Sequence, residues 1–137
     1  MEIIAGGCLL IQAIWDIRTK ELPLWMSLVL GGSGFVYSVC YKNYDLEIII
    51  ALLPGLLCLF LGYVTRQAVG YGDGILICSL GMIYTWQEVV QICSIAIVFA
   101  GLAGLILLVV FQKNRKYEIP FVPFLFLGWC LLSVMHL

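Results

Sequence analysis

The chain has 137 residues, of which 64% are hydrophobic and only 11% are charged, and its mean hydropathy is +1.11. Soluble domains are about 25% charged, so this chain lacks the polar residues needed to cover a water-exposed surface. The formal net charge of −1 and the lack of a basic stripe in the sequence argue against nucleic acid as a partner. The composition therefore predicts a polytopic membrane protein with the lipid bilayer as its surroundings.

The sequence begins with Met1-Glu2-Ile3-Ile4, which lacks the positive segment of a cleaved signal peptide, so the first apolar run is expected to remain as a span. No polar stretch is long enough for a separate soluble domain, and residues 1–137 are read as one membrane-embedded domain. Loop residues divide the chain into six apolar runs. We predict an all-α fold with six transmembrane helices, at about 2–15, 23–41, 46–64, 74–86, 89–111 and 119–137.

Two of the six runs, the first and the fourth, are short for a helix that crosses the membrane, which needs about 20 residues. Extending them draws Asp16 and Asp73 into the helix ends. The cytoplasmic face is indicated by Lys and Arg in short loops. The loops after the second and fourth runs hold one basic residue, Lys42. The loops after the first, third and fifth runs hold six: Arg18, Lys20, Arg66, Lys113, Arg115 and Lys116. We therefore predict a multi-pass plasma-membrane protein with both termini outside and both aspartates on the cytoplasmic side.

The six cysteines are scattered through or beside the apolar runs and form no Cys-x-x-Cys pair. In a membrane span, cysteine usually serves as a small apolar residue. No disulfide, metal site or cofactor is expected from this pattern. Glycines at Gly31, Gly32 and Gly34 suit close contacts between helices.

Asp16 and Asp73 are the strongest candidates for chemistry, because a carboxylate at the rim of a membrane segment is costly and commonly functional. Two carboxylates that share one proton can hydrolyse a peptide, one acting as base on a water and the other donating a hydrogen bond to the scissile carbonyl. Gly70 and Gly72 permit positive φ, and we expect them to form a flexible loop that delivers Asp73 onto the start of the fourth helix. The pair predicts an intramembrane aspartyl protease.

Simpler roles for both aspartates stay open at this point. Asp16 can cap a helix or pair with Arg18 or Lys20, and Asp73 can be the N-cap of the fourth helix. Gln12 precedes Asp16 by one helical turn, so its side chain can bond the aspartate pair or pack against another helix.

Three segments, in chain order, form a recognisable set. Residues 16–23 read Asp-Ile-Arg-Thr-Lys-Glu-Leu-Pro, residues 70–73 read Gly-Tyr-Gly-Asp, and residues 119–125 read Ile-Pro-Phe-Val-Pro-Phe-Leu. Together they resemble the type IV prepilin leader peptidases, a family of G-x-G-D intramembrane aspartyl proteases. The likeness is to short single-domain members, such as those serving archaellin precursors or Tad/Flp-type pilins.

The resemblance implies that Asp16 and Asp73 are the catalytic pair and that Pro23, Pro120 and Pro123 shape loops near the pocket. It implies a prepilin-like protein substrate whose short basic leader is cut on the cytoplasmic side. Many relatives have a lysine two residues after the motif's aspartate, where this chain has Ile75. Long members also carry paired Cys-x-x-Cys motifs, which this chain lacks, so N-methyltransferase activity is not expected.

Two other classes of function compete with the aspartyl protease. The first is a serine intramembrane protease, because Gly31-Gly32-Ser33-Gly34 matches a G-x-S-G pattern and His136 is the only histidine. Its dyad would need Ser33 and His136 within hydrogen-bond reach. The second is a non-catalytic membrane subunit or an ion-coupled transporter that uses Asp16 and Asp73, since intramembrane carboxylates also mark ion pathways.

Overall fold

The computed structural model describes residues 2–19, 21, 23–41, 46–66, 70–112 and 119–136. All regular structure in these residues is helical, as predicted. Six helices follow one another along the chain: α1 (Glu2–Thr19), α2 (Leu24–Tyr41), α3 (Leu46–Val64), α4 (Tyr71–Ile83), α5 (Trp86–Val109) and α6 (Val122–Met135).

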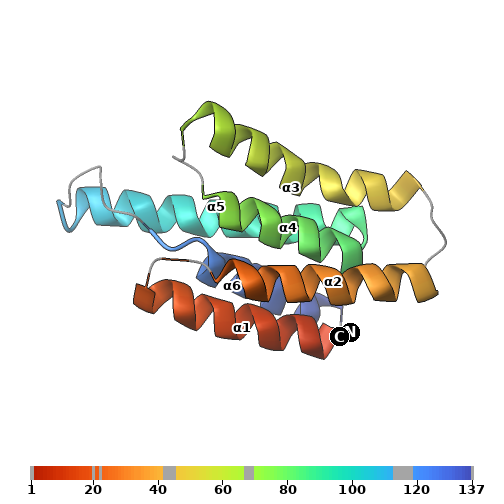
Figure 1. Cartoon of the computed structure of the whole chain (residues 1–137). Helices are drawn as coiled ribbons and strands as arrows, with labels where there is room; N and C mark the ends of the chain where they lie inside the picture. Colours follow the sequence, from red (N-terminus) through yellow and green to blue (C-terminus); the bar gives the residue numbers. More distant parts are fainter. Residues whose placement is uncertain are drawn as a thin grey trace.

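Successive helices run in opposite directions through the bundle (Figure 1). The ends of α1, α3 and α5 therefore lie at one end of the bundle, and both chain termini lie at the other. We call the first of these the aspartate end, because α1 finishes there at Thr19 and α4 begins there at Tyr71. The helix ends that precede the three Lys- and Arg-rich loops thus lie at one end of the molecule.

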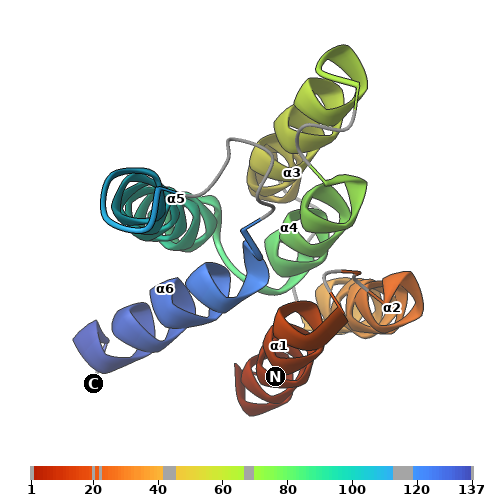
Figure 2. The same ribbon diagram turned by 90° about the vertical axis from the view of Figure 1, so that its left-hand side faces the viewer.

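The centre of the bundle is α4, which packs against α2, α3 and α5, while α6 packs against α1 and α5 (Figure 2). Seven of the 13 residues of α4 are buried, against three of the 19 residues of α3. Backbones of α3 and α4 approach closely at two glycines: a Cβ on Gly55 would collide with Cys78, and one on Gly81 would collide with the carbonyl of Ala51. Small residues allow this contact, as is common between membrane helices.

Several helix boundaries differ from the prediction, including both at the junction of the fourth and fifth helices. The fourth helix was expected at 74–86 and the fifth from residue 89, whereas α4 ends at Ile83 and α5 begins at Trp86. The cause is a capping box at Thr85, whose backbone N–H and hydroxyl both donate to Glu88 Oε2 at 2.9 Å. This arrangement satisfies donors at the start of a helix and fixes where it begins. The last helix is also shorter than the predicted run 119–137.

Three helices, α2, α3 and α5, are long and apolar enough to cross a membrane, and α4 and α6 are shorter apolar helices. Large apolar side chains are exposed along them, as suits a protein surrounded by lipid. The spans through α1, α4 and α6, and the outside position of the termini, remain predictions. Pro54 lies inside α3 without ending it.

Candidate active site

Asp16 lies one turn before the end of α1 and is only 5% exposed. It belongs to the buried stripe of this helix, whose members recur every three or four residues: Ala5, Leu9, Gln12, Ala13 and Asp16. Residues with this spacing share one helix face. The apolar residues that bury α1 therefore also carry the carboxylate into the bundle.

The carboxylate of Asp16 meets the first turn of α6. Its Oδ2 accepts a hydrogen bond of 3.3 Å from the backbone N–H of Val122, which is fully buried. The first N–H groups of a helix have no partner within the helix, and the next residue, Pro123, has no N–H to offer. Asp16 thus satisfies a buried donor at the positive end of a helix, where a negative charge is favoured.

Asp73 lies in the first turn of α4 and is half-buried. Its backbone N–H donates to Gly70 O at 3.2 Å. A Cβ on Gly70 would lie 3.2 Å from Asp73 Oδ2, so glycine at this position leaves room for the carboxylate. Gly70 of the motif therefore leaves space beside the Asp73 carboxylate that a larger side chain would occupy.

The expected flexible loop at Gly70 and Gly72 is not what the structure contains. The helix already begins at Tyr71, so Gly72 and Asp73 belong to its first turn. Gly70 has φ −65° and ψ 129°, an extended conformation open to any residue, and no glycine among the described residues has a positive φ. The expectation was wrong because helix α4, packed between α2 and α3, extends to the motif itself.

The two aspartates come from different helices and both lie at the aspartate end, Asp16 in the last turn of α1 and Asp73 in the first turn of α4. Within the described residues, no ion pair joins Asp16 to Arg18, which is exposed; Lys20 lies outside those residues. The site thus holds two carboxylates, one from α1 and one from α4.

The three prolines of the predicted site lie at helix beginnings. Pro23 precedes α2, and its carbonyl accepts the N–H of Met26 at 2.9 Å. Pro120 and Pro123 bracket the start of α6, and the residue between them that bonds Asp16 is Val122. This backbone donor was missed by sequence reasoning, because nothing in the sequence pairs residue 16 with a residue 106 positions later.

The residues of the serine-protease alternative do not form a dyad. Ser33 Oγ donates to Leu30 O of its own helix at 2.9 Å. His136 is exposed at the end of α6, at the end of the bundle that holds the termini. In the described part of the chain, no group of three His, Cys, Asp or Glu side chains is arranged to hold a metal ion.

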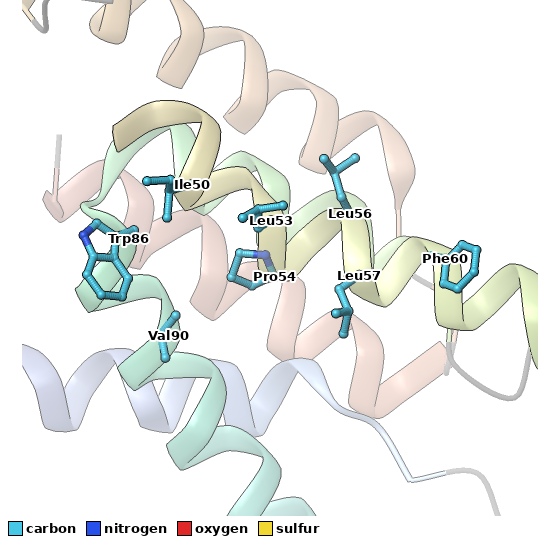
Figure 3. A pocket seen from close by; sticks show the side chains of 8 residues that line it. All are labelled: Ile50, Leu53, Pro54, Leu56, Leu57, Phe60, Trp86 and Val90. Atoms are coloured by element: carbon cyan, nitrogen blue, oxygen red, sulfur yellow. The ribbon is translucent and has the colours of Figure 1, made fainter. Parts of the chain in front are cut away.

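An open apolar groove of about 570 Å³ lies between α3 and the start of α5 (Figure 3). Its labelled side chains include Pro54 and Phe60 of α3 and Trp86 of α5. All of its lining residues are apolar or aromatic, and neither aspartate lines it. The groove is therefore separate from the site at the aspartate end.

The chain belongs to the type IV leader peptidase family, whose model matches residues 3–135.

Two curated relatives are both called prepilin leader peptidase/N-methyltransferase. The one from Pectobacterium carotovorum subsp. carotovorum is 28% identical over 145 aligned positions, covering 93% of this chain and 48% of the relative. The one from Dickeya chrysanthemi is 27% identical over 138 positions, covering 96% and 47%. The chain thus spans about half the length of these relatives. No solved structure matches it significantly.

Proposed function

We propose that this chain is an intramembrane aspartic endopeptidase that removes the short basic leader from prepilin-like precursors at the cytoplasmic membrane face. Type IV pilins, Tad/Flp-type pilins or related proteins are the substrates. The observation that carries the proposal is the placement of two carboxylates at one end of the bundle, Asp16 buried near the end of α1 and bonded by the Val122 N–H, and Asp73 in the first turn of α4. Membership of the leader peptidase family supports the same reaction. The proposal is confined to the peptidase activity, because the chain matches only about half of relatives named for two activities.

Asp16 is assigned as the ionised member of the pair, because its carboxylate accepts the Val122 N–H at the start of α6. Asp73 then carries the proton that two neighbouring carboxylates share. Asp16 takes a proton from water as the water oxygen bonds to the scissile carbonyl carbon, and Asp73 gives its proton to the carbonyl oxygen. When the resulting diol collapses, the C–N bond breaks, Asp16 passes its proton to the leaving amine, and Asp73 recovers its proton from the hydroxyl.

One part of the substrate would lie in the lipid bilayer and another part in the cytoplasm. Its hydrophobic helix lies in the bilayer, beside the exposed apolar faces of the bundle. Its basic leader stays in the cytoplasm at the aspartate end. This arrangement would place the bond between leader and helix near the level of Asp16 and Asp73.

A cleavage assay tests the proposal. The chain is co-expressed with each member of a panel of prepilin-like precursors, and loss of the leader is followed by gel shift and by mass spectrometry of the new N-terminus. Asp16→Asn and Asp73→Asn each keep the side-chain size and remove the acid. The control is Glu47→Gln, which makes the same change at an exposed carboxylate in the first turn of α3, at the opposite end of the bundle.

Wild type and Glu47→Gln are expected to cut at least one precursor, whereas each Asn variant loses at least roughly 100-fold in rate, as expected on removal of a general acid or base. Full cleavage by either Asn variant would overturn the assignment of that aspartate. Failure of wild-type protein, shown to be folded and in the membrane, to cut any precursor of the panel would overturn the peptidase proposal.

A further inference from the structure

Buried polar side chains are concentrated in one place. The described residues include five that are buried. Three of them, Gln12, Ser27 and Ser79, are joined across α1, α2 and α4, and Asp16 lies one turn from Gln12 on the buried face of α1. Burying polar groups in an apolar bundle is costly unless they bond to one another. Such a cluster beside a candidate catalytic residue therefore requires an explanation.

Hydrogen bonds connect three of these residues across the helices. Ser79 Oγ of α4 lies 2.9 Å from Ser27 O of α2, to which it donates. Gln12 Nε2 of α1 donates to Ser27 Oγ at 3.5 Å. Ser27 thus anchors one end of the Gln12 amide, and α4 in turn holds the backbone of α2 at Ser27.

The other end of the Gln12 amide has no partner. Gln12 is 0% exposed, and its Oε1 is the one buried side-chain nitrogen or oxygen in the described part of the chain that lacks a hydrogen bond. Unpaired polar atoms in a protein interior are rare and call for a specific cause, such as a bound water or a catalytic role. This atom is the second observation, besides the cluster, that points to a ligand.

The position of Gln12 relative to Asp16 indicates what that ligand is. Residues four apart on a helix lie on the same face, separated by about 6 Å along the axis. Gln12 therefore lies one turn deeper in the bundle than Asp16, on the same buried stripe of α1. One water molecule that donates a hydrogen to each can bridge a carboxylate and an amide oxygen on neighbouring turns of one helix face.

We infer that Gln12 is a positioning residue for the proposed peptidase reaction, holding with Oε1 a buried water that donates its second hydrogen to the Asp16 carboxylate. Ser27 fixes the amide in the orientation that this requires. The water is distinct from the one consumed in hydrolysis. It keeps Asp16 ionised and correctly aimed, so Gln12 acts through Asp16 and does not touch the substrate. This inference rests on the proposed function.

The test compares Gln12→Met with Gln91→Met in purified protein, using a precursor that wild type cleaves. Methionine has nearly the volume of glutamine without its hydrogen-bonding groups. Gln91 is exposed on α5, outside the cluster, and controls for the chemical change alone. Rates are measured per folded molecule, with kcat and KM determined separately and the folded fraction measured by circular dichroism.

Gln12→Met is expected to lower kcat by roughly 3- to 10-fold, the effect of one lost hydrogen bond, while KM and the folded fraction match Gln91→Met. A purely structural role predicts lower stability, because the substitution breaks the bond from Gln12 to Ser27, with kcat per folded molecule unchanged. Unchanged kcat in folded Gln12→Met would therefore overturn the inference. If Asp16→Asn and Asp73→Asn still cut the precursor, it is the proposed function that fails.

A second pair of variants keeps the test decisive if Gln12→Met does not fold. Ser27→Ala releases the anchored end of the Gln12 amide, and Ser38→Ala removes the other buried serine of α2, which lies outside the cluster. Ser27→Ala is expected to lower kcat with KM unchanged, and Ser38→Ala to leave both unchanged. Equal kcat for the two serine variants would overturn the inference.

Discussion

The contact between α5 and α6 depends on the absence of a side chain at Gly128. A Cβ built there would lie 2.8 Å from the backbone oxygen of Ile92. Ordinary contact begins at 3.4 Å, so Gly128→Ala forces the two helices apart by about 0.6 Å. The obstructing atom belongs to the backbone and cannot rotate away as a side chain would.

The energetic cost follows from this overlap. Overfilling a well-packed contact costs about 1–3 kcal/mol, whereas alanine gains up to about 1 kcal/mol over glycine in a helix interior. Gly101→Ala is the matched control, because a Cβ at Gly101 of α5 meets nothing within 4 Å. Both variants receive the helix-propensity gain, so the difference in their free energies of unfolding isolates the overlap and should be about 1–3 kcal/mol.

The assay is equilibrium unfolding in mixed micelles with increasing mole fraction of sodium dodecyl sulfate, followed by circular dichroism. Gly128→Ala is expected to unfold at lower detergent fraction than wild type, and Gly101→Ala at an equal or higher fraction. Coincident unfolding curves for the two variants would refute the reasoning, because they would show that α5 and α6 are not held at this distance.

Two further predictions concern the end of the bundle that holds the termini. Tyr84→Phe removes the acceptor of the 2.7 Å bond from Trp129 Nε1 and is expected to cost about 1 kcal/mol of unfolding free energy, with per-molecule cleavage unchanged. Equal detergent midpoints for Tyr84→Phe and for Tyr63→Phe, a change at an exposed tyrosine, would show that the bond does not stabilise the bundle. Glu88→Ala removes the N3 half of the capping box at Thr85 and is expected to cost about 0.3–1.5 kcal/mol. An unchanged midpoint for Glu88→Ala would show that this box does not fix the start of α5.

Helix positions were predictable where apolar runs end at clear polar boundaries. The observed bounds of α3 equal the predicted run 46–64, and α2 differs from its run by a single residue. The shift at the junction of α4 and α5 was also readable in principle, because Thr85-x-x-Glu88 is a capping-box signature. It was missed because hydrophobicity alone was used to divide that segment.

Helix contacts were predicted less well than helix positions. Gly31 and Gly34 do face α4, where added Cβ atoms would lie 2.9 Å from Ser79 and Ile83, but Gly32 meets nothing within 4 Å. The closest backbone approach, between α3 and α4 at Gly55 and Gly81, was not anticipated. A glycine pattern shows where backbones are able to approach, and only the assembled bundle decides which of them do.

For the aspartate pair too, the general location was predictable from the sequence and the detailed contacts were not. Loop charges predicted that Asp16 and Asp73 share one side, and the structure places the ends of α1 and α4 that carry them together. The donor at Val122 and the unpaired amide of Gln12 depend on how α6 and α2 fit against α1. Such contacts join residues far apart in the chain, and no local pattern encodes them.

The hydrogen bond from Val122 to Asp16 also sets an order of events during synthesis. The first helix leaves the ribosome early, but its carboxylate obtains this backbone donor only when the beginning of the last helix has been made and inserted. A nascent chain carrying five helices would hold both aspartates without the contact that orients one of them. If the proposed function holds, the chain would be unable to cleave while its own apolar segments, and those of neighbours at the translocon, are still entering the bilayer.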